Sequence, residues 1–101
     1  MKELVTIIIS SLACHGVWAN ADLANKHNCM ACHAVDKKIV GPSFQEVTNK
    51  YVGQPDAEKY LAQSIKVGGV GKWGQMPMPP QVQLSDTDAK SLATWILNGA
   101  K

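Results

Sequence analysis

Five consecutive residues constrain this chain more than any other stretch, and they are Cys29-Met30-Ala31-Cys32-His33. On a helical turn, positions i, i+3 and i+4 share one face, so Cys29, Cys32 and His33 can point toward one flat partner. Two thiols at this spacing can add to the two vinyl groups of a porphyrin, and the adjacent imidazole can then bind the iron. The pattern is therefore typical of covalent attachment of haem c.

Three other interpretations of the same residues stay open at this point. A C-x-x-C pair also occurs in dithiol redox sites and as one half of a zinc site. Zinc would need two more ligands, and beyond the N-terminal segment the chain offers only His33 and His27 as histidines. A chance match is the third interpretation. The rest of the chain has to separate these alternatives.

The first 21 residues have the pattern of a Sec-type signal peptide. Lys2 precedes an apolar run of about ten residues, which is shorter than the roughly 20 residues that a membrane-spanning helix needs. Ala19-Asn20-Ala21 then gives the small-x-small pattern that signal peptidase cleaves. We expect a signal peptide over residues 1–21, export to the periplasm and no stable membrane insertion.

Two alternatives to this cleaved leader remain. The apolar run could instead form a buried N-terminal helix. Cys14 could also carry a lipid anchor, although Ser11-Leu12-Ala13-Cys14 lacks the leucine that usually stands three places before such a cysteine.

Cleavage after Ala21 would leave one domain, residues 22–101, which is 80 of the 101 residues. A chain this short buries only about 60% of its unfolded surface and usually needs an added core or staple. Its two remaining cysteines are three positions apart, so a disulfide between them would close almost no loop. A covalently held haem would supply the missing apolar core.

The charge pattern limits the classes of partner. The formal net charge is +2, and all ten basic residues are lysines. Without an arginine cluster or a basic and aromatic stripe, the chain is not expected to bind nucleic acid. A positive rim for acidic partners is one interpretation of the lysines, and scattered solvated side chains are the other; the candidates for the rim are Lys26, Lys37, Lys38 and Lys66.

The periodicity predicts an all-α fold of about four short helices, with no strand. Asp22 is expected to cap the first helix, which runs through Lys26 into the cysteine motif. Ser43 and Glu46 form a capping box for the second helix, and Pro55 suits the first position of the third. Ser85 opens the last helix. The expected inward residues are Phe44, Val47, Tyr51, Tyr60, Leu61, Ile65, Leu92, Ala93, Trp95 and Ile96.

The stretch between Gly68 and Leu84 has no helical period and is rich in glycine and proline. Loops of this length in compact domains are often functional. Met76 and Met78 both lie in it, and a thioether is a soft ligand that raises the potential of a histidine-ligated haem. Prolines on both sides of Met78 restrict its backbone most, which favours Met78 over Met76 as the sixth ligand.

The chain resembles the small bacterial class I monohaem cytochromes c of the short periplasmic type. The resemblance covers residues 22–101 and depends on an ordered series of motifs, namely Cys29-Met30-Ala31-Cys32-His33, Val40-Gly41-Pro42, Leu61-Ala62-Gln63, Val70-Gly71, Trp73-Gly74, Met78-Pro79-Pro80 and Trp95-Ile96-Leu97. It implies four short helices wrapped around one haem c bound through two thioether bonds.

The resemblance also implies roles for single residues. His33 and Met78 would be the axial iron ligands, and Cys29 and Cys32 would carry the thioethers. Pro42 would accept the ring N–H of the histidine, the indole of Trp73 would reach a haem propionate, and the amide of Gln81 would approach the methionine sulfur.

Two positions depart from the family pattern. Ser64 stands where some members carry an arginine near a propionate. Lys72 stands directly before Trp73, where an apolar residue is often found.

The function implied is that of a monomeric, non-enzymatic electron carrier in a respiratory chain. Its partners would be redox proteins such as a nitrite reductase, a peroxidase or a terminal oxidase. The rival is a haem-based enzyme or sensor in which the distal methionine is displaced by a small molecule.

Overall fold

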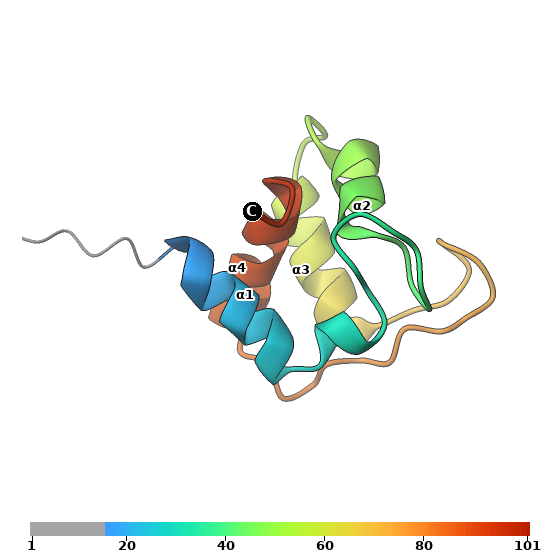
Figure 1. Ribbon diagram of the computed structural model, residues 1–101, viewed down its shortest axis with the longest axis horizontal. Helices are drawn as coiled ribbons and strands as arrows, with labels where there is room; N and C mark the ends of the chain where they lie inside the picture. Colours follow the sequence, from blue (N-terminus) through green and yellow to red (C-terminus); the bar gives the residue numbers. More distant parts are fainter. Residues whose placement is uncertain (1–15) are drawn as a thin grey trace, which may run out of the picture.

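The computed structural model describes residues 16–101 and is all-α in this range, as the sequence predicts. Its helices are α1 (Gly16–Lys26), α2 (Phe44–Tyr51), α3 (Ala57–Val67) and α4 (Asp86–Leu97), with a short 3₁₀ turn η1 (Cys29–Ala31) after α1 (Figure 1). Most of the predicted signal peptide, residues 1–15, lies outside the described residues.

The start of the first helix differs from the prediction. In the described structure α1 begins at Gly16, so Asp22 lies inside the helix and is not its N-cap. The helix also stops before the cysteine motif, because Asn28 adopts a left-handed conformation with φ 61°. Asparagine tolerates that conformation better than most residues. Cys29 and Cys32 consequently lie on η1 and at its end, and not on a continuation of the helix.

Two of the other predicted helix starts are confirmed, and one is wrong. The hydroxyl oxygens of Ser43 and Ser85 accept hydrogen bonds from the backbone N–H groups of Glu46 and Asp88, respectively, which caps α2 and α4. Pro55 is not the first residue of α3. The helix begins at Ala57, because Asp56 has a left-handed φ of 60° that a helix interior does not contain.

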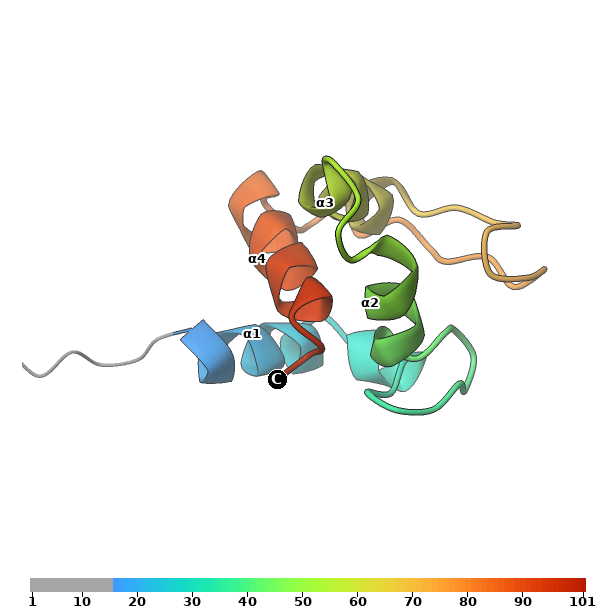
Figure 2. The same cartoon turned by 90° about the horizontal axis from the view of Figure 1, so that it is seen from above.

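Helix α4 is the central element of the core. It packs against α1, α2 and α3, and Figure 2 shows it lying between α1 and α3. Ala24 of α1 and Ala93 of α4 are both fully buried, so small side chains stand where these two helices meet. Thr48 donates from its hydroxyl to the carbonyl of Ile96, which ties α2 to the end of α4.

The segment between α3 and α4 contains an extended arm, residues 69–78, which projects away from the helices (Figures 1 and 2). Gly69 and Met78 pair at its base, each donating its N–H to the carbonyl of the other at 3.1 and 2.8 Å. The N–H of Gln81 then donates to the carbonyl of Ile65 in α3. The arm is thus fastened at its base to the end of α3.

Within residues 16–101, the structure has no helix with the length and apolar character that crossing a membrane requires.

Candidate functional site

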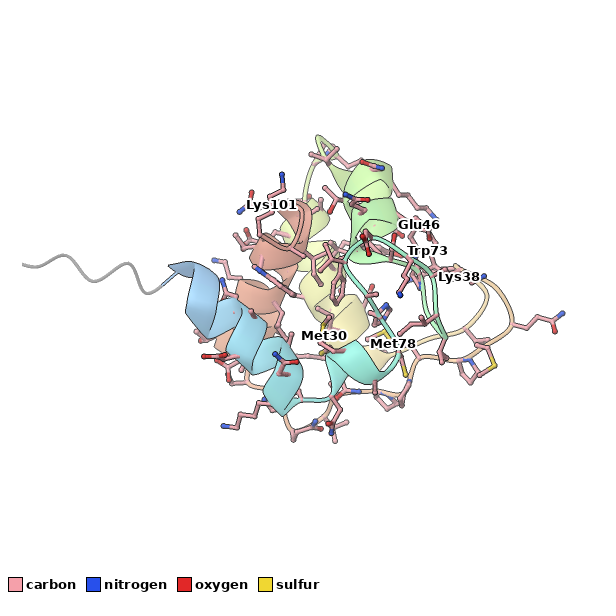
Figure 3. The ribbon with its side chains drawn as sticks, in the orientation of Figure 1. Met30, Lys38, Glu46, Trp73, Met78 and Lys101 are labelled. Carbon is pink, nitrogen blue, oxygen red and sulfur yellow. The ribbon has the colours of Figure 1, made fainter. Side chains whose placement is uncertain are left out.

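One largely apolar cavity lies among the helices, η1 and the arm. Of the site residues predicted from the sequence, six line it: Cys29, Cys32, His33, Pro42, Trp73 and Met78. Gln81 is not part of the lining. Figure 3 shows Met78 below Trp73, with Met30 marking the η1 turn on the side toward α1. The structure therefore brings together residues that are up to 49 positions apart, from Cys29 to Met78.

His33 is held in one orientation by three neighbours. Its Nδ1 donates to the carbonyl oxygen of Pro42 at 2.7 Å, and because that oxygen can only accept, the proton is on Nδ1 and the lone pair of Nε2 is free to bind a metal. The ring of Phe44 stacks on the imidazole at 5.2 Å between centroids. Gly41 packs so closely that a Cβ there would lie 2.5 Å from Cε1 of His33. Only glycine fits this position without moving the ring.

The surroundings of Cys29 favour a neutral sulfur over an anionic one. Both thiols are free and half-buried in the structure. Burial raises the pKa of the Cys29 thiol above its usual range, and the nearby Cys32 adds to the shift, although a backbone hydrogen bond opposes it. A thiolate is therefore disfavoured here. A thioether to a haem carries no charge and has no such cost.

A zinc site finds no support in the described part of the chain. Residues 16–101 contain no group of three or more His, Cys, Asp or Glu side chains placed to hold a metal ion. The cavity instead offers one imidazole, the thioethers of Met76 and Met78, and mostly apolar walls, which is a donor set that suits haem iron.

Met78 reaches the cavity because the backbone around it packs tightly on the end of α3. A Cβ on Gly68 would lie 2.4 Å from the carbonyl oxygen of Met78 and 2.8 Å from the nitrogen of Pro80. Met78 itself is half-buried, whereas Met76 leaves 67% of its surface exposed. Both methionines line the cavity. Met78 is the more enclosed of the two.

Trp73 and Gln81 have different surroundings. Trp73 packs edge-on against Tyr51 at 6.4 Å, and the ammonium of Lys50 lies 4.6 Å from the centre of the indole ring. The amide of Gln81 donates to the carbonyl of Pro79 at 3.3 Å, and its oxygen accepts from Gln83. Its proposed role beside the methionine sulfur requires this amide to turn from Pro79 toward the cavity.

Sequence reasoning did not foresee two groups of residues in this cavity. Tyr60, Ser64 and Lys72 form a polar cluster on its wall, with the ammonium of Lys72 at 3.5 Å from Oγ of Ser64 and 4.5 Å from the centre of the Tyr60 ring. The two departures from the family pattern, Ser64 and Lys72, are thus direct neighbours, and only the fold reveals this. Ser64 and Lys72 each stood out singly in the sequence, but nothing there joined them.

Trp95 is the second unforeseen feature, since it was expected only as a core residue. It lines the cavity with 5% of its surface exposed, and its ring packs edge-on against Phe44. Its Nε1 is buried and has no hydrogen-bond partner in the described part of the chain. A buried N–H without an acceptor is costly, so this atom calls for a partner supplied by a bound group or a water molecule.

Among the four lysines considered for a positive rim, Lys66 is paired elsewhere. Its ammonium forms an ion pair with Asp86 in a groove between α3 and α4, away from the cavity. This ion pair lowers the pKa of the Asp86 carboxyl.

Known proteins resemble this chain over most of its length. A family model described as "Cytochrome c" matches residues 19–100. "Cytochrome c-552" of Nitrosomonas europaea is 57% identical over 79 residues, which cover 78% of this chain and 77% of the relative. "Cytochrome c-552" of Hydrogenobacter thermophilus is 48% identical over 97% of this chain and 98% of its own length.

A solved structure agrees with these sequence matches. The crystal structure of wild-type Nitrosomonas europaea cytochrome c552 superposes with a TM-score of 0.76 and 56% identity, over 78% of this chain and 98% of that one. Such electron-transfer cytochromes are carriers and not enzymes, and their partners are redox proteins. With its C-x-x-C-H motif on the cavity wall, this chain binds haem c covalently, and it belongs to the cytochrome c family as a small class I monohaem electron carrier.

Proposed function

We propose that this chain is a periplasmic electron carrier whose haem is ligated by His33 and Met78. The observation that carries the proposal is that the two side chains line the same cavity from separate parts of the chain. Gly41 packs closely on the ring of His33, and Gly68 packs closely on the backbone of Met78. His33 follows η1, and Met78 ends the arm.

The haem iron supplies one-electron exchange between its ferrous and ferric states. The chain's residues keep the surroundings of the iron unchanged during that exchange. Pro42 and Phe44 fix the His33 ring, and the pairing of the Gly69 and Met78 backbones holds the chain segment that carries the thioether. Rigid ligands on both sides lower the reorganisation that each electron transfer requires and leave no open position for a small molecule.

Transfer to a partner would occur where the cavity reaches the surface. Val40, Val70 and Met76 line the cavity and are each more than 40% exposed, so they form an apolar surface where the cavity opens. Short-lived redox encounters use small interfaces of this kind. By the resemblance, the partners are respiratory redox proteins such as a nitrite reductase, a peroxidase or a terminal oxidase. Residues 1–21 would direct the chain to the periplasm and be removed.

A spectrum of the purified holoprotein tests the ligation. We expect the methionine-to-iron charge-transfer band in the oxidised protein near neutral pH and little binding of carbon monoxide by the reduced protein. Ready binding of carbon monoxide would refute the carrier with two filled axial positions and favour a small-molecule sensor. N-terminal sequencing of the protein recovered from the periplasm tests the leader, and a start other than Asp22 would move the cleavage site.

The two methionines provide a matched pair of variants. Met78→Ala should remove the charge-transfer band and open the iron to carbon monoxide, because it takes away the enclosed thioether. Met76→Ala removes an equal side chain from the same arm and should leave the spectrum unchanged. The reverse result would assign the iron ligand to Met76.

A further inference from the structure

The lining of the haem cavity contains a single formally charged side chain, that of Lys72. Every other lysine, aspartate and glutamate of residues 16–101 is absent from this lining. Lys72 is exposed, so water solvates its ammonium, and the side chain lies at the edge of the cavity without a burial cost. This position would put the ammonium within reach of an anion that a bound haem carries.

Contacts with α3 hold the Lys72 side chain in place. Its ammonium lies 4.5 Å from the centre of the Tyr60 ring, in cation–π contact, and 3.5 Å from the hydroxyl oxygen of Ser64. The interaction with Lys72 also lowers the pKa of the Tyr60 hydroxyl. The arm residue is thus positioned by two side chains that are four positions apart on one face of α3.

Lys72 has no carboxylate partner in the described part of the chain. The ion pairs of residues 16–101 join Lys66 to Asp86 and Lys90 to Glu58, both between α3 and α4. The ammonium of Lys72 is therefore available for an anion that comes from outside the polypeptide.

Haem c carries two such anions, its propionate carboxylates, and the attachment chemistry says where they must lie. The thioether bonds hold the vinyl-bearing side of the porphyrin at Cys29 and Cys32, whereas the propionates extend from the other side of the ring. Trp73, next to Lys72, packs on Tyr51 of α2, and Figure 3 shows it apart from Met30 of the attachment turn. The polar cluster of Tyr60, Ser64 and Lys72 would therefore face the propionates of a haem attached at Cys29 and Cys32.

We propose that Lys72, positioned by Ser64 and Tyr60, pairs with a haem propionate and raises the reduction potential of the haem. Reduction adds one electron to the haem, so a cation beside it stabilises the ferrous state more than the ferric state. This role rests on the proposed electron-carrier function. It gives Lys72 a part in setting the free energy of electron transfer to a partner. Lys72 is a tuning residue and not an iron ligand.

The experiment is an equilibrium redox titration of the holoprotein without a partner. Lys72→Met keeps most of the side-chain length and removes the charge, and the equilibrium constant for reduction should fall by about two- to tenfold. Lys59→Met is the matched control, since Lys59 is an exposed lysine of α3 that lines the separate α3/α4 groove. It should shift the constant much less.

A rescue variant tests the position as well as the charge. Because Oγ of Ser64 lies next to the ammonium of Lys72, an arginine at position 64 would place a cation at the same site. Lys72→Met combined with Ser64→Arg should recover most of the lost potential. Equal shifts in Lys72→Met and Lys59→Met, or no recovery in the double variant, would overturn the proposal.

These outcomes are separable from failure of the carrier function. If the unmodified protein did not titrate reversibly as a six-coordinate haem, the ligation by His33 and Met78 would be refuted. If it did and Lys72→Met left the potential unchanged, only the tuning role would be lost. An effect of Lys72→Met confined to the rate of transfer to a partner would reassign Lys72 to docking and overturn the propionate pairing.

Discussion

Glycines beside both proposed axial ligands decide how closely the polypeptide can approach the haem site. Gly41 lies against the imidazole of His33, and Gly68 lies against the backbone of Met78. Neither glycine touches the iron in the proposed site, yet each sets the position of a group that does. In the sequence these two positions look like ordinary turn residues, because the atoms that exclude a side chain come from distant parts of the chain.

Gly41→Ala is expected to displace His33. Its Cβ would lie 2.5 Å from Cε1 and 2.9 Å from Nδ1 of the ring, so the imidazole must move and its hydrogen bond to Pro42 weakens. We expect a loss of about 1–3 kcal/mol in the free energy of unfolding, as for other overpacked sites, together with a changed haem spectrum. Denaturant titration and absorption spectra measure the two effects.

Gly69→Ala is the control, since a Cβ at Gly69 would meet no atom within 4 Å. It should cost little stability and leave the spectrum unchanged. A Gly41→Ala protein with wild-type stability and spectrum would contradict the tight packing on His33.

The helices themselves follow closely from local sequence signals, whereas the segments between them do not. The serine caps of α2 and α4 were predictable because capping involves residues only three positions apart. The left-handed Asn28 and Asp56, which end α1 early and delay α3, have no comparable local signal. The pairing of Gly69 with Met78 and the contact of Lys72 with Ser64 depend on how the arm folds back on α3, so sequence patterns could not reveal them.

As with the helices, the parts of the candidate site that depend on local motifs were predictable, and the parts that depend on packing were not. The cysteines and His33 stand in one motif whose spacing reflects the chemistry of haem attachment, whereas Met78 was favoured by its flanking prolines and by the family resemblance. The surroundings of Gln81 and the unpaired indole N–H of Trp95 result from packing between elements, which spacing does not encode.

At the level of elements, Gly68 joins α3 to the arm. It has a left-handed φ of 72°, and a Cβ there would also collide with the carbonyl of Met78. Gly68→Ala should therefore lower the free energy of unfolding by about 1–2 kcal/mol through backbone strain alone, with a further loss from the collision. It should also weaken the charge-transfer band at temperatures at which the helices stay folded.

Thermal melts followed by far-ultraviolet circular dichroism and by the charge-transfer band distinguish these effects. In Gly68→Ala the band should disappear at a lower temperature than the helical signal. Coincident loss of both signals would show that the arm and the helices unfold as one unit.

For the molecule as a whole, the haem cavity takes the place of part of the hydrophobic core. Core residues from all four helices line it, including Ala24 of α1, Phe44 of α2, Leu61 of α3 and Leu92 of α4. A domain of this size buries only a small apolar core of its own, so the bound haem should contribute a large share of its free energy of unfolding.

Cys29→Ala combined with Cys32→Ala is expected to prevent stable folding, because the haem could no longer be held covalently in the core. Far-ultraviolet circular dichroism should show loss of most helical signal. Ala31→Ser, an exposed change within the same motif, should keep both haem and helices. A compact, helical double variant would contradict the role of the haem as part of the core.

The two hydrogen bonds between Gly69 and Met78 also make the release of the proposed sixth ligand measurable through the rate of amide hydrogen exchange. Both amide protons are held by a single backbone pairing at the base of the arm, so one local opening exposes them together to solvent. The same opening would release the thioether from the iron while the helices stay intact. Amide hydrogen exchange at Gly69 and Met78 should therefore report how often the haem loses its sixth ligand, and it should slow in whichever oxidation state binds that ligand more tightly.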